Sequence, residues 1–244
     1  MSARWYFDRL PSTQSHAVEL ARSGAPAGTR VVAGVQGDGR GRLDHHWVSP
    51  PGSLYLSLIA PSEVAGGPHV SLTVGAALHE LLRDRWGVPT EIQWPNDLRT
   101  LRSHGARKIA GVLVDGIRAG EATRTVIGVG LNVSTAREEF PPELRRRVAF
   151  LGDFLAPVPP LGEVEEAVVG SVDHALEELG RPGGAARYLE VCRRALYGRG
   201  SVVRVDGRAV GRVREVADDG ALLVEGPTGP VEVRSGEVAV EEAS

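Results

Sequence analysis

The longest apolar runs of this chain have the length of β-strands. LYLSLIA at 54–60 is one of them, and no stretch approaches the roughly 18 uncharged apolar residues of a membrane helix. Similar runs follow the pattern of buried strands: TRVVAGVQ at 29–36, KIAGVLVDGI at 108–117 and TVIGVGLNV at 125–133. We therefore expect a sheet-based core and no contact with a membrane.

Amphipathic helical patterns lie between and after these strands. A helix is expected to start at Ser12 or Thr13, which have the side chains of N-caps, and to stop near Gly24. Further helices are predicted at 69–86, 142–150, 163–179 and 184–197, and further short strands at 4–10 and 91–94. Strands gathered before helices, with some helix between them, predict an α+β domain with one mixed sheet.

The sequence changes character from Gly200 onward. Short valine-rich alternating runs, such as GRAVGRVREV and GPVEVRSGEVAV, are separated by Gly and Asp-Gly turns. This segment predicts a small β-barrel of SH3 type that docks on the first domain, because it is too small to be stable alone. We expect a catalytic domain over residues 1–197 and the barrel over 198–244.

Composition excludes several classes of function. The net charge of −3 provides no basic field for nucleic acid, and the dense basic run 145–147 is expected to be a solvated helix face. The single cysteine, Cys192, excludes an internal disulfide framework and a cysteine-ligated cluster. The N-terminus carries charge where a secretory signal needs an apolar region, and it leaves no room for a DNA-binding helix-turn-helix. We expect a reduced, cytoplasmic protein that does not bind DNA.

Lys108 is the single lysine among 28 basic residues. Arginine serves at most surface positions, but it cannot replace a compact ammonium that must reach one oxygen. Since Arg107 already supplies surface charge there, the retained lysine predicts a specific role.

The segment GDGRGR at 37–42 combines three glycines with two arginines. Glycines allow successive N–H groups to face an anion, and each arginine adds a fork of donors. Neither a Walker A loop nor a dinucleotide-binding spacing is present. The alternative is a mobile surface loop, and the following pair His45-His46 is more typical of loop polarity than of a metal site.

Two asparagines and a carboxylate complete the candidate set. Asn96 and Asp97 follow Pro95 at a strand end, where Asp97 could hold magnesium together with substrate phosphates, although an ordinary Asx turn is the alternative. Gly111 would let a ligand approach the strand closely, and Asn132 is a polar group in an apolar strand. No serine has the surroundings of a hydrolytic nucleophile.

In order along the chain, these motifs resemble biotin–protein ligases. The motifs are STQ (12–14), Q-x-x-GRGR (36–42), W-x-SP-x-G-x-LYLS (47–57), WPND (94–97), RKIAGVLVD (107–115) and GVGLNV (128–133). The resemblance spans nearly the whole chain, including the barrel. It is closest to the short monofunctional class without an N-terminal DNA-binding domain, whose catalytic core is class II synthetase-like.

The resemblance implies a two-step reaction. The family makes biotinyl-5′-adenylate from biotin and MgATP, and then passes biotin to one lysine of a biotin carboxyl carrier protein. Biotin, ATP and Mg²⁺ are therefore the expected small molecules, and a homodimer through a sheet edge is plausible for the family.

Individual roles follow from the resemblance in the same way. Lys108 and Arg40 are the expected catalytic residues, with Lys108 reaching the biotin carboxylate and the adenylate phosphate, and Asp97 is the expected magnesium contact. The expected ligand-binding residues are Ser12, Thr13, Gln14 and Gln36 at the biotin head group, the loop residues Gly39, Arg40, Gly41 and Arg42, and Trp47, Asn96, Lys108, Gly111 and Asn132.

One segment departs from the family pattern. After GRGR the family has a further basic stretch, whereas this chain has Leu43-Asp44-His45-His46. We expect faster escape of the adenylate, and loop closure that tightens as pH falls through the ordinary histidine range near 6.5.

Two other functions stay open at this point. A lipoate– or octanoate–protein ligase would share the fold and the acyl-adenylate chemistry, but the intact GRGR and the barrel count against it. A non-catalytic biotin- or nucleotide-binding protein would not require the sole lysine.

Overall fold

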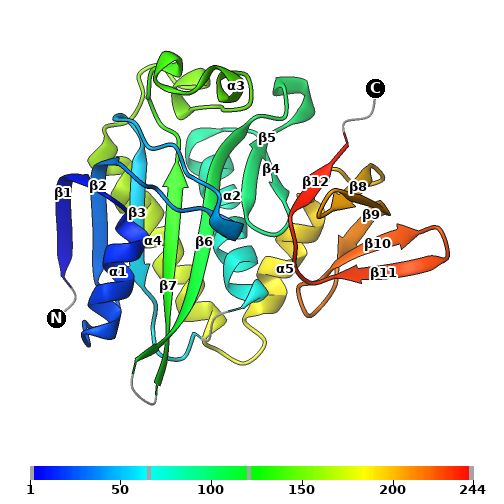
Figure 1. The fold of residues 1–244 in the computed structure, drawn as a ribbon, viewed down its shortest axis with the longest axis horizontal. Helices are drawn as coiled ribbons and strands as arrows, with labels where there is room; N and C mark the ends of the chain where they lie inside the picture. Colours follow the sequence, from blue (N-terminus) through cyan, green and yellow to red (C-terminus); the bar gives the residue numbers. More distant parts are fainter. Residues whose placement is uncertain (1–2, 65–66, 120–121, 242–244) are drawn as a thin grey trace.

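The structure, a computed structural model, describes residues 3–64, 67–119 and 122–241. Its main sheet has seven strands: β1 (Arg4–Leu10), β2 (Arg30–Gln36), β3 (Leu54–Ile59), β4 (Thr90–Gln93), β5 (Asp97–Thr100), β6 (Lys108–Ala119) and β7 (Ala122–Leu131). They lie in the order β1-β2-β3-β7-β6-β5-β4 (Figure 1). β1 is parallel to β2, and the other neighbouring pairs are antiparallel. The predicted mixed sheet is confirmed.

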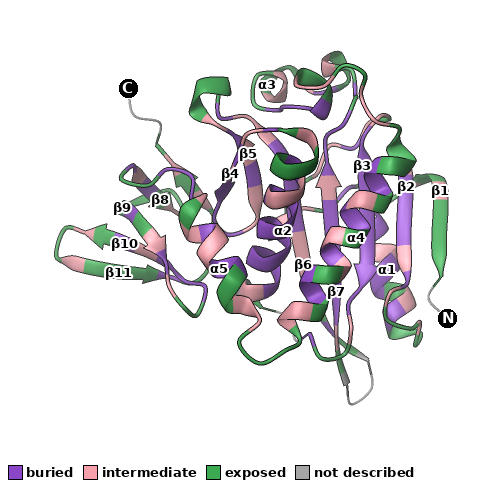
Figure 2. Cartoon of the chain, turned by 180° about the vertical axis from the view of Figure 1, so that it is seen from behind, coloured by how far each residue is buried: buried purple, intermediate pink, exposed green. Residues whose placement is uncertain are grey.

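Helices cover both faces of this sheet. α1 (Thr13–Arg22), capped by the Ser12 side chain as predicted, packs on one face. α2 (Pro68–Trp86) and α4 (Leu161–Leu179) pack on the other, which Figure 2 shows from behind. Successive side chains of a strand point to opposite faces, so Val31 packs with α1 while Val32 joins the core beneath α2 and α4. The central strand β3 is thereby buried on both faces.

The C-terminal segment forms a second, antiparallel sheet. Its strands are β8 (Val202–Val205), β9 (Arg208–Val216), β10 (Leu222–Gly226), β11 (Gly229–Val233) and β12 (Val238–Val240), in the order β11-β10-β9-β8-β12. The predicted SH3-like barrel after an α+β domain is confirmed. The boundary between residues 1–197 and 198–244 stays a prediction.

The barrel is anchored on the main domain. Its apolar residues form one buried cluster with α2 and α5 (Ala185–Arg194). The Trp94 indole N–H, which is almost fully buried, donates to the Gly220 carbonyl at 2.9 Å, and Gln93 Nε2 donates to the Val238 carbonyl at 3.1 Å. The last residue of β4 and the first residue of the turn after it therefore connect the two sheets by hydrogen bonds.

The secondary-structure predictions fail in two places. The helix expected at 142–150 is only α3 (Pro142–Arg145), because the next residues extend alongside the start of β6. There the Lys108 N–H donates to the Arg147 carbonyl, and the Ala149 N–H donates to the Lys108 carbonyl, both at 2.8 Å. Strand β5 was not predicted, because its four residues directly follow the turn. The strand patterns at 108–117 and 125–133 also predict a polar turn around 119–121, of which residues 120 and 121 lie outside the described residues.

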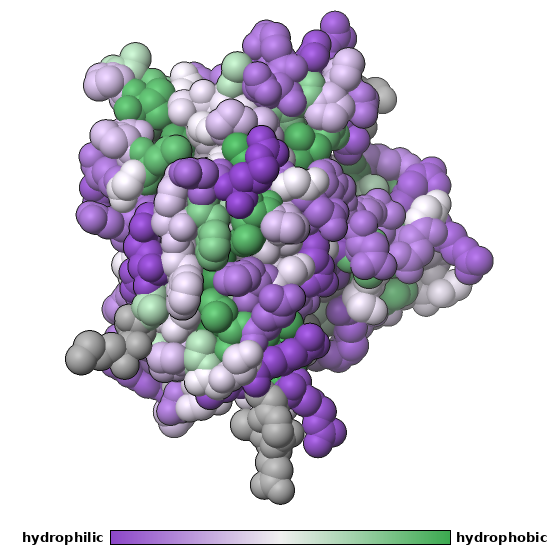
Figure 3. Space-filling model, turned by 60° about the vertical axis from the view of Figure 1, so that its left-hand side comes forward, coloured by the Kyte–Doolittle hydropathy of each residue, from purple (hydrophilic) through white to green (hydrophobic). Residues whose placement is uncertain are grey.

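Strand β1 forms one edge of the main sheet. Trp5 and Tyr6 are exposed on it, and Figure 3, which turns this side forward, shows hydrophobic residues among hydrophilic ones.

In the described ranges, no helix combines the length and the apolar character needed to cross a membrane.

Candidate active site

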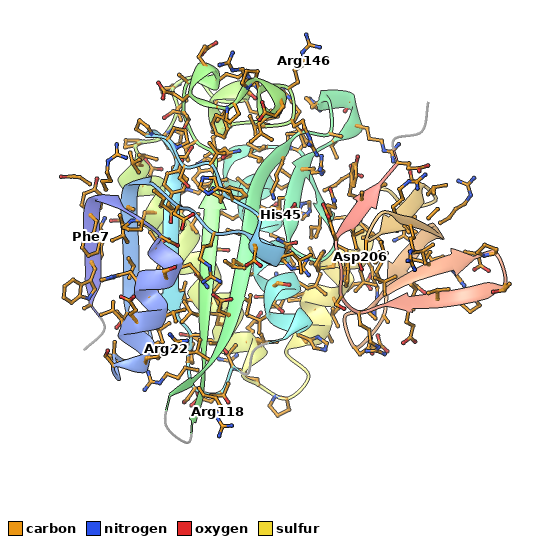
Figure 4. All side chains as sticks on the ribbon, in the orientation of Figure 1. Phe7, Arg22, His45, Arg118, Arg146 and Asp206 are labelled. Carbon is orange, nitrogen blue, oxygen red and sulfur yellow. The ribbon has the colours of Figure 1, made fainter. Side chains whose placement is uncertain are left out.

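The GDGRGR segment belongs to a hairpin over residues 36–49. Its arms pair through bridges between Gln36 and Ser49 and between Arg40 and His46. Leu43 and Asp44 form the tip, with φ of 52° and 60°. Figure 4 shows His45 in front of the main sheet, on the side toward the barrel. The hairpin therefore covers the sheet face on which α1 also packs.

Trp47 anchors this hairpin on a glycine floor. A Cβ added at Gly130 would lie 2.5 Å from the indole ring, and one added at Gly111 would lie 2.8 Å from it. These two glycines are opposite each other on β7 and β6. The group that approaches Gly111 is thus the Trp47 ring. The added Cβ at Gly111 would also lie 3.3 Å from Asp97 Oδ1. The buried indole Nε1 of Trp47 has no hydrogen-bond partner in the described part of the chain.

A cavity of about 790 Å³ opens between the hairpin, the sheet and the barrel. Every predicted site residue except Ser12 and Gly39 lines it: Thr13, Gln14, Gln36, Arg40, Gly41, Arg42, Trp47, Asn96, Asp97, Lys108, Gly111 and Asn132. Ser12 accepts a hydrogen bond from the Ser15 N–H at 3.3 Å, and Gly39 accepts one from the Trp47 N–H at 2.7 Å. A side chain at Gly39 would also meet Ser49 Oγ at 2.6 Å, so this glycine lets the hairpin close.

Lys108 stands at the start of β6 with its ammonium in the cavity. Nζ lies 2.8 Å from Asp97 Oδ2 and 4.8 Å from the centre of the Trp47 ring. Both side chains of the ion pair are mostly buried, with exposed fractions of 29% for Lys108 and 17% for Asp97. The point charge is thus oriented by a carboxylate on one side and by an aromatic face on the other.

Arg42 approaches the same carboxylate from the hairpin. Its Nη1 donates to Asn96 Oδ1 at 3.3 Å, and Asn96 Nδ2 donates to Asp97 Oδ1 at 3.1 Å. Burial lowers the pKa of the Arg42 guanidinium, and the nearby Asp97 acts in the opposite direction. The WPND turn therefore gathers an ammonium and a guanidinium around one carboxylate.

Thr13 and Gln36 form a polar group at the start of α1. Gln36 Oε1 accepts from the Thr13 N–H at 2.8 Å and from its hydroxyl at 3.0 Å, while Gln36 Nε2 donates to Ser49 Oγ at 2.8 Å. Gln14 is fixed by the sheet, since Nε2 donates to the Val126 carbonyl at 3.2 Å. This end of the cavity offers hydrogen bonds without a net charge.

Asn132 is 2% exposed. Its Nδ2 donates to the Lys108 carbonyl at 3.3 Å and to the Ala149 carbonyl at 3.1 Å. This amide therefore fixes the backbone from which Lys108 extends.

Sequence reasoning missed part of the cavity wall. Arg146 and Arg147 are exposed, as expected of a solvated run, and they also line the cavity, as do residues 237–240 of the barrel. Asp115 also escaped notice as a contact of Arg40, although it ends the RKIAGVLVD motif and could have been found there. The barrel residues carried no signal, because short alternating strands do not show which end faces a neighbouring domain.

The donor set suits magnesium held largely by a substrate. Among the described residues, no three His, Cys, Asp or Glu side chains are grouped closely enough to form a protein cage for a metal. Asp97 is the carboxylate beside Lys108, and one carboxylate with substrate phosphates is a common way of binding Mg²⁺.

Comparison with known proteins defines the class. A family model described as "Biotin/lipoate A/B protein ligase family" matches residues 6–132, more than half of the chain. These residues include the hairpin, the WPND turn and Lys108. The chain belongs to this family.

Individual relatives are more specific. The bifunctional ligase/repressor BirA of Bacillus subtilis is 36% identical over 144 residues, covering 57% of this chain and 43% of BirA. The chloroplastic biotin–protein ligase 1 of Arabidopsis thaliana is 32% identical over 136 residues, covering 53% and 36%. These alignments span less than half of the curated relatives.

A solved structure covers the complete chain. The biotin protein ligase of Aquifex aeolicus, in complex with biotin and ATP, matches with a TM-score of 0.85 at 24% identity over 100% of both chains. This likeness confirms the fold, including the C-terminal sheet.

Proposed function

We propose that this chain is an ATP-dependent biotin–protein ligase. The position of its single lysine carries the proposal, because Lys108 Nζ lies in the cavity, 2.8 Å from Asp97 and over the Trp47 ring. Arg40 and Arg42 line the same cavity. Membership of the family supports the assignment, as do the ligases among the relatives.

The first step joins two anions. A biotin carboxylate oxygen attacks the α-phosphorus of ATP, the bond from that phosphorus to the bridging oxygen breaks, and pyrophosphate leaves. Lys108 and Arg40 supply positive charge where the carboxylate and phosphate meet, and Arg42 adds a third cation. Lys108 is a charge-bearing group here and forms no covalent bond.

Mg²⁺ would be held by Asp97 and the phosphates of ATP, and would neutralise charge on the departing pyrophosphate. Before ATP binds, Asp97 serves as the partner of Lys108. The same carboxylate thus sets the ammonium position in the free protein.

The uncharged end of the cavity suits the biotin head group. Thr13 and Gln36 line it with a hydroxyl and an amide that hydrogen-bond to each other in the ligand-free protein, and the family resemblance predicts that both bind the head group. Gln14 contributes through its fixed amide. Direct contacts with the ligand stay predictions for every residue of the site, including Ser12 and Gly39, which do not line the cavity.

The second step transfers the acyl group. The amine of an acceptor lysine attacks the acyl carbon of biotinyl-5′-adenylate, and AMP leaves. The hairpin 36–49 and Trp47 cover the cavity floor, which limits hydrolysis of the mixed anhydride. We propose a biotin carboxyl carrier protein as the acceptor, and a cytoplasmic enzyme that does not bind DNA. Size-exclusion chromatography would distinguish a monomer from a homodimer.

Pyrophosphate–ATP exchange tests the proposal. With labelled pyrophosphate, we expect exchange that depends on biotin and is absent with lipoate or octanoate. Transfer to a carrier-protein domain, read by avidin blotting, then tests the second step. Exchange with lipoate instead would keep the chemistry and change the substrate. No exchange with any of the three acids would refute adenylation and leave a binding protein.

A further inference from the structure

Asp115 lies on β6 beneath the hairpin and has no role in the function proposed above. Its Oδ2 accepts from Arg40 Nη1 at 3.1 Å and from Gln14 Nε2 at 3.2 Å. One carboxylate oxygen thus joins three elements: the hairpin, α1 and the strand that begins at Lys108.

The contact with Arg40 leaves most of the guanidinium available. In the described part of the chain, the side-chain hydrogen bond of Arg40 uses Nη1. A guanidinium has five N–H donors in a planar fork, so Nε and Nη2 can still bind an anion. Asp115 therefore ties one nitrogen of the fork to the sheet and leaves the other donors available for an anion.

Gln14 is held from two directions. Ser57, fully buried on β3, donates to Oε1 at 2.9 Å, while Asp115 and the Val126 carbonyl accept from Nε2. A Cβ at Gly128 would lie 2.7 Å from Oε1, so the amide also packs directly on β7. Gln14 is thus the fixed partner in this arrangement, and the hairpin is the element that Asp115 holds to the sheet.

We propose that Asp115 is a positioning residue that holds Arg40 and its hairpin over the ligand cavity. The inference rests on the proposed adenylation, because the anion for which Arg40 is held is the carboxylate and phosphate of the acyl-adenylate. Arg40 and Asp115 are 42% and 24% exposed as side chains, so the pair is accessible enough to open when a ligand enters or leaves.

Hydrogen exchange in the ligand-free protein tests the positioning directly. The Gly41 and Trp47 N–H groups are bonded within the hairpin, each at 2.7 Å. In Asp115→Asn, which keeps the shape and removes the charge, we expect these amides to exchange about tenfold faster, the effect of losing a charge-assisted hydrogen bond. Asp84→Asn is the matched control, because Asp84 also accepts from an arginine, Arg83 on α2, and does not line the cavity.

Release of a non-hydrolysable acyl-sulfamate analogue of biotinyl-adenylate tests the link to the ligand. We expect Asp115→Asn to release it about tenfold faster than wild type, with Asp84→Asn unchanged. Arg40→Gln should accelerate release by a similar factor. The Asp115→Asn/Arg40→Gln double variant should release the analogue no faster than Arg40→Gln alone, because both changes break the same ion pair. Asp115→Glu keeps the charge and should recover part of the slow release.

The outcomes separate the two proposals. If the Gly41 and Trp47 amides of Asp115→Asn exchange at the wild-type rate, the inference is overturned whatever the ligand is. It is also overturned if the double variant accelerates release by the product of the two single-variant effects. A wild-type protein that does not bind the analogue would refute the proposed function, and with it the role toward the adenylate. The exchange result would still decide whether Asp115 holds the hairpin.

Discussion

Replacing Gly130 by alanine tests whether the glycine floor positions Trp47. The new Cβ would lie 2.5 Å from the indole ring and 2.8 Å from its Nε1. To restore an ordinary carbon–carbon separation of ~3.5 Å, the ring must withdraw by about 1 Å. Since Gly130 has ordinary strand backbone, the clash is the main consequence of the change.

The ring belongs to the hairpin. Relief of the clash is therefore expected to displace the hairpin and disturb ligand binding more than it disturbs the packing of the core. Overpacking costs roughly 1–3 kcal/mol. If this whole free-energy cost appears as a loss of ligand affinity, binding weakens by roughly fivefold to roughly 150-fold. Withdrawal of the ring also removes the aromatic face 4.8 Å from Lys108 Nζ.

Calorimetric titration with the acyl-sulfamate analogue measures the effect, and thermal unfolding measures the stability of the fold. Gly116→Ala is the matched control. Gly116 is on β6, where it pairs with β7, and nothing lies within 4 Å of its added Cβ. We expect Gly130→Ala to weaken binding while the main transition persists, and Gly116→Ala to bind normally. Wild-type affinity in Gly130→Ala, or equal losses in both variants, would refute the role of the floor.

Three further predictions follow from the charges. Lys108→Gln should lower pyrophosphate exchange by about 10²–10³-fold with the fold intact, and ATP-dependent labelling at the wild-type rate would contradict its role. Burial lowers the pKa of His79 to about 4, so His79 stays neutral in the folded protein. Its contribution of up to about 3 kcal/mol is complete above the unfolded pKa near 6.5 and is lost as pH falls toward 4. Urea unfolding at pH 7.5 and 4.5 should show this loss, and His79→Gln should reduce it. His45 Nε2 lies 3.9 Å from Glu237 Oε1, and His46 Nδ1 lies 3.6 Å from Asp38 Oδ1. The loop closure expected from the sequence predicts slower adenylate release at pH 6 than at pH 8, and a rate independent of pH would disprove it.

The elements with a clear period could be predicted from the sequence. Strands β2, β3, β6 and β7 are apolar on both faces because helices or the hairpin cover both sides, and such runs are legible without a structure. The start of helix α1 was predicted from the capping side chain of Ser12. Short elements that depend on backbone contacts with distant residues could not be predicted from the sequence. The extended residues 147–149 beside Lys108 are an example.

The candidate site was predictable as a set of residues but not as a set of contacts. The motif around Lys108 indicated the cavity, and Lys108 is there. That Trp47 would fill the space above Gly111 depends on how the hairpin folds back, which no local pattern encodes. The RKIAGVLVD motif marks Asp115, but its pairing with Arg40 was equally hidden, since the two residues are 75 positions apart.

The hydrogen bond from Trp94 to the barrel bears on how this chain can be engineered. One residue of the turn, Trp94, donates to the barrel, while Asn96 and Asp97 of the same turn face the cavity. A barrel exchanged with that of a relative would bring its own acceptor for the indole and its own version of the wall at 237–240. A chimera should therefore take the turn and the barrel from the same parent, because the hydrogen bond of Trp94 and the cavity wall depend on both.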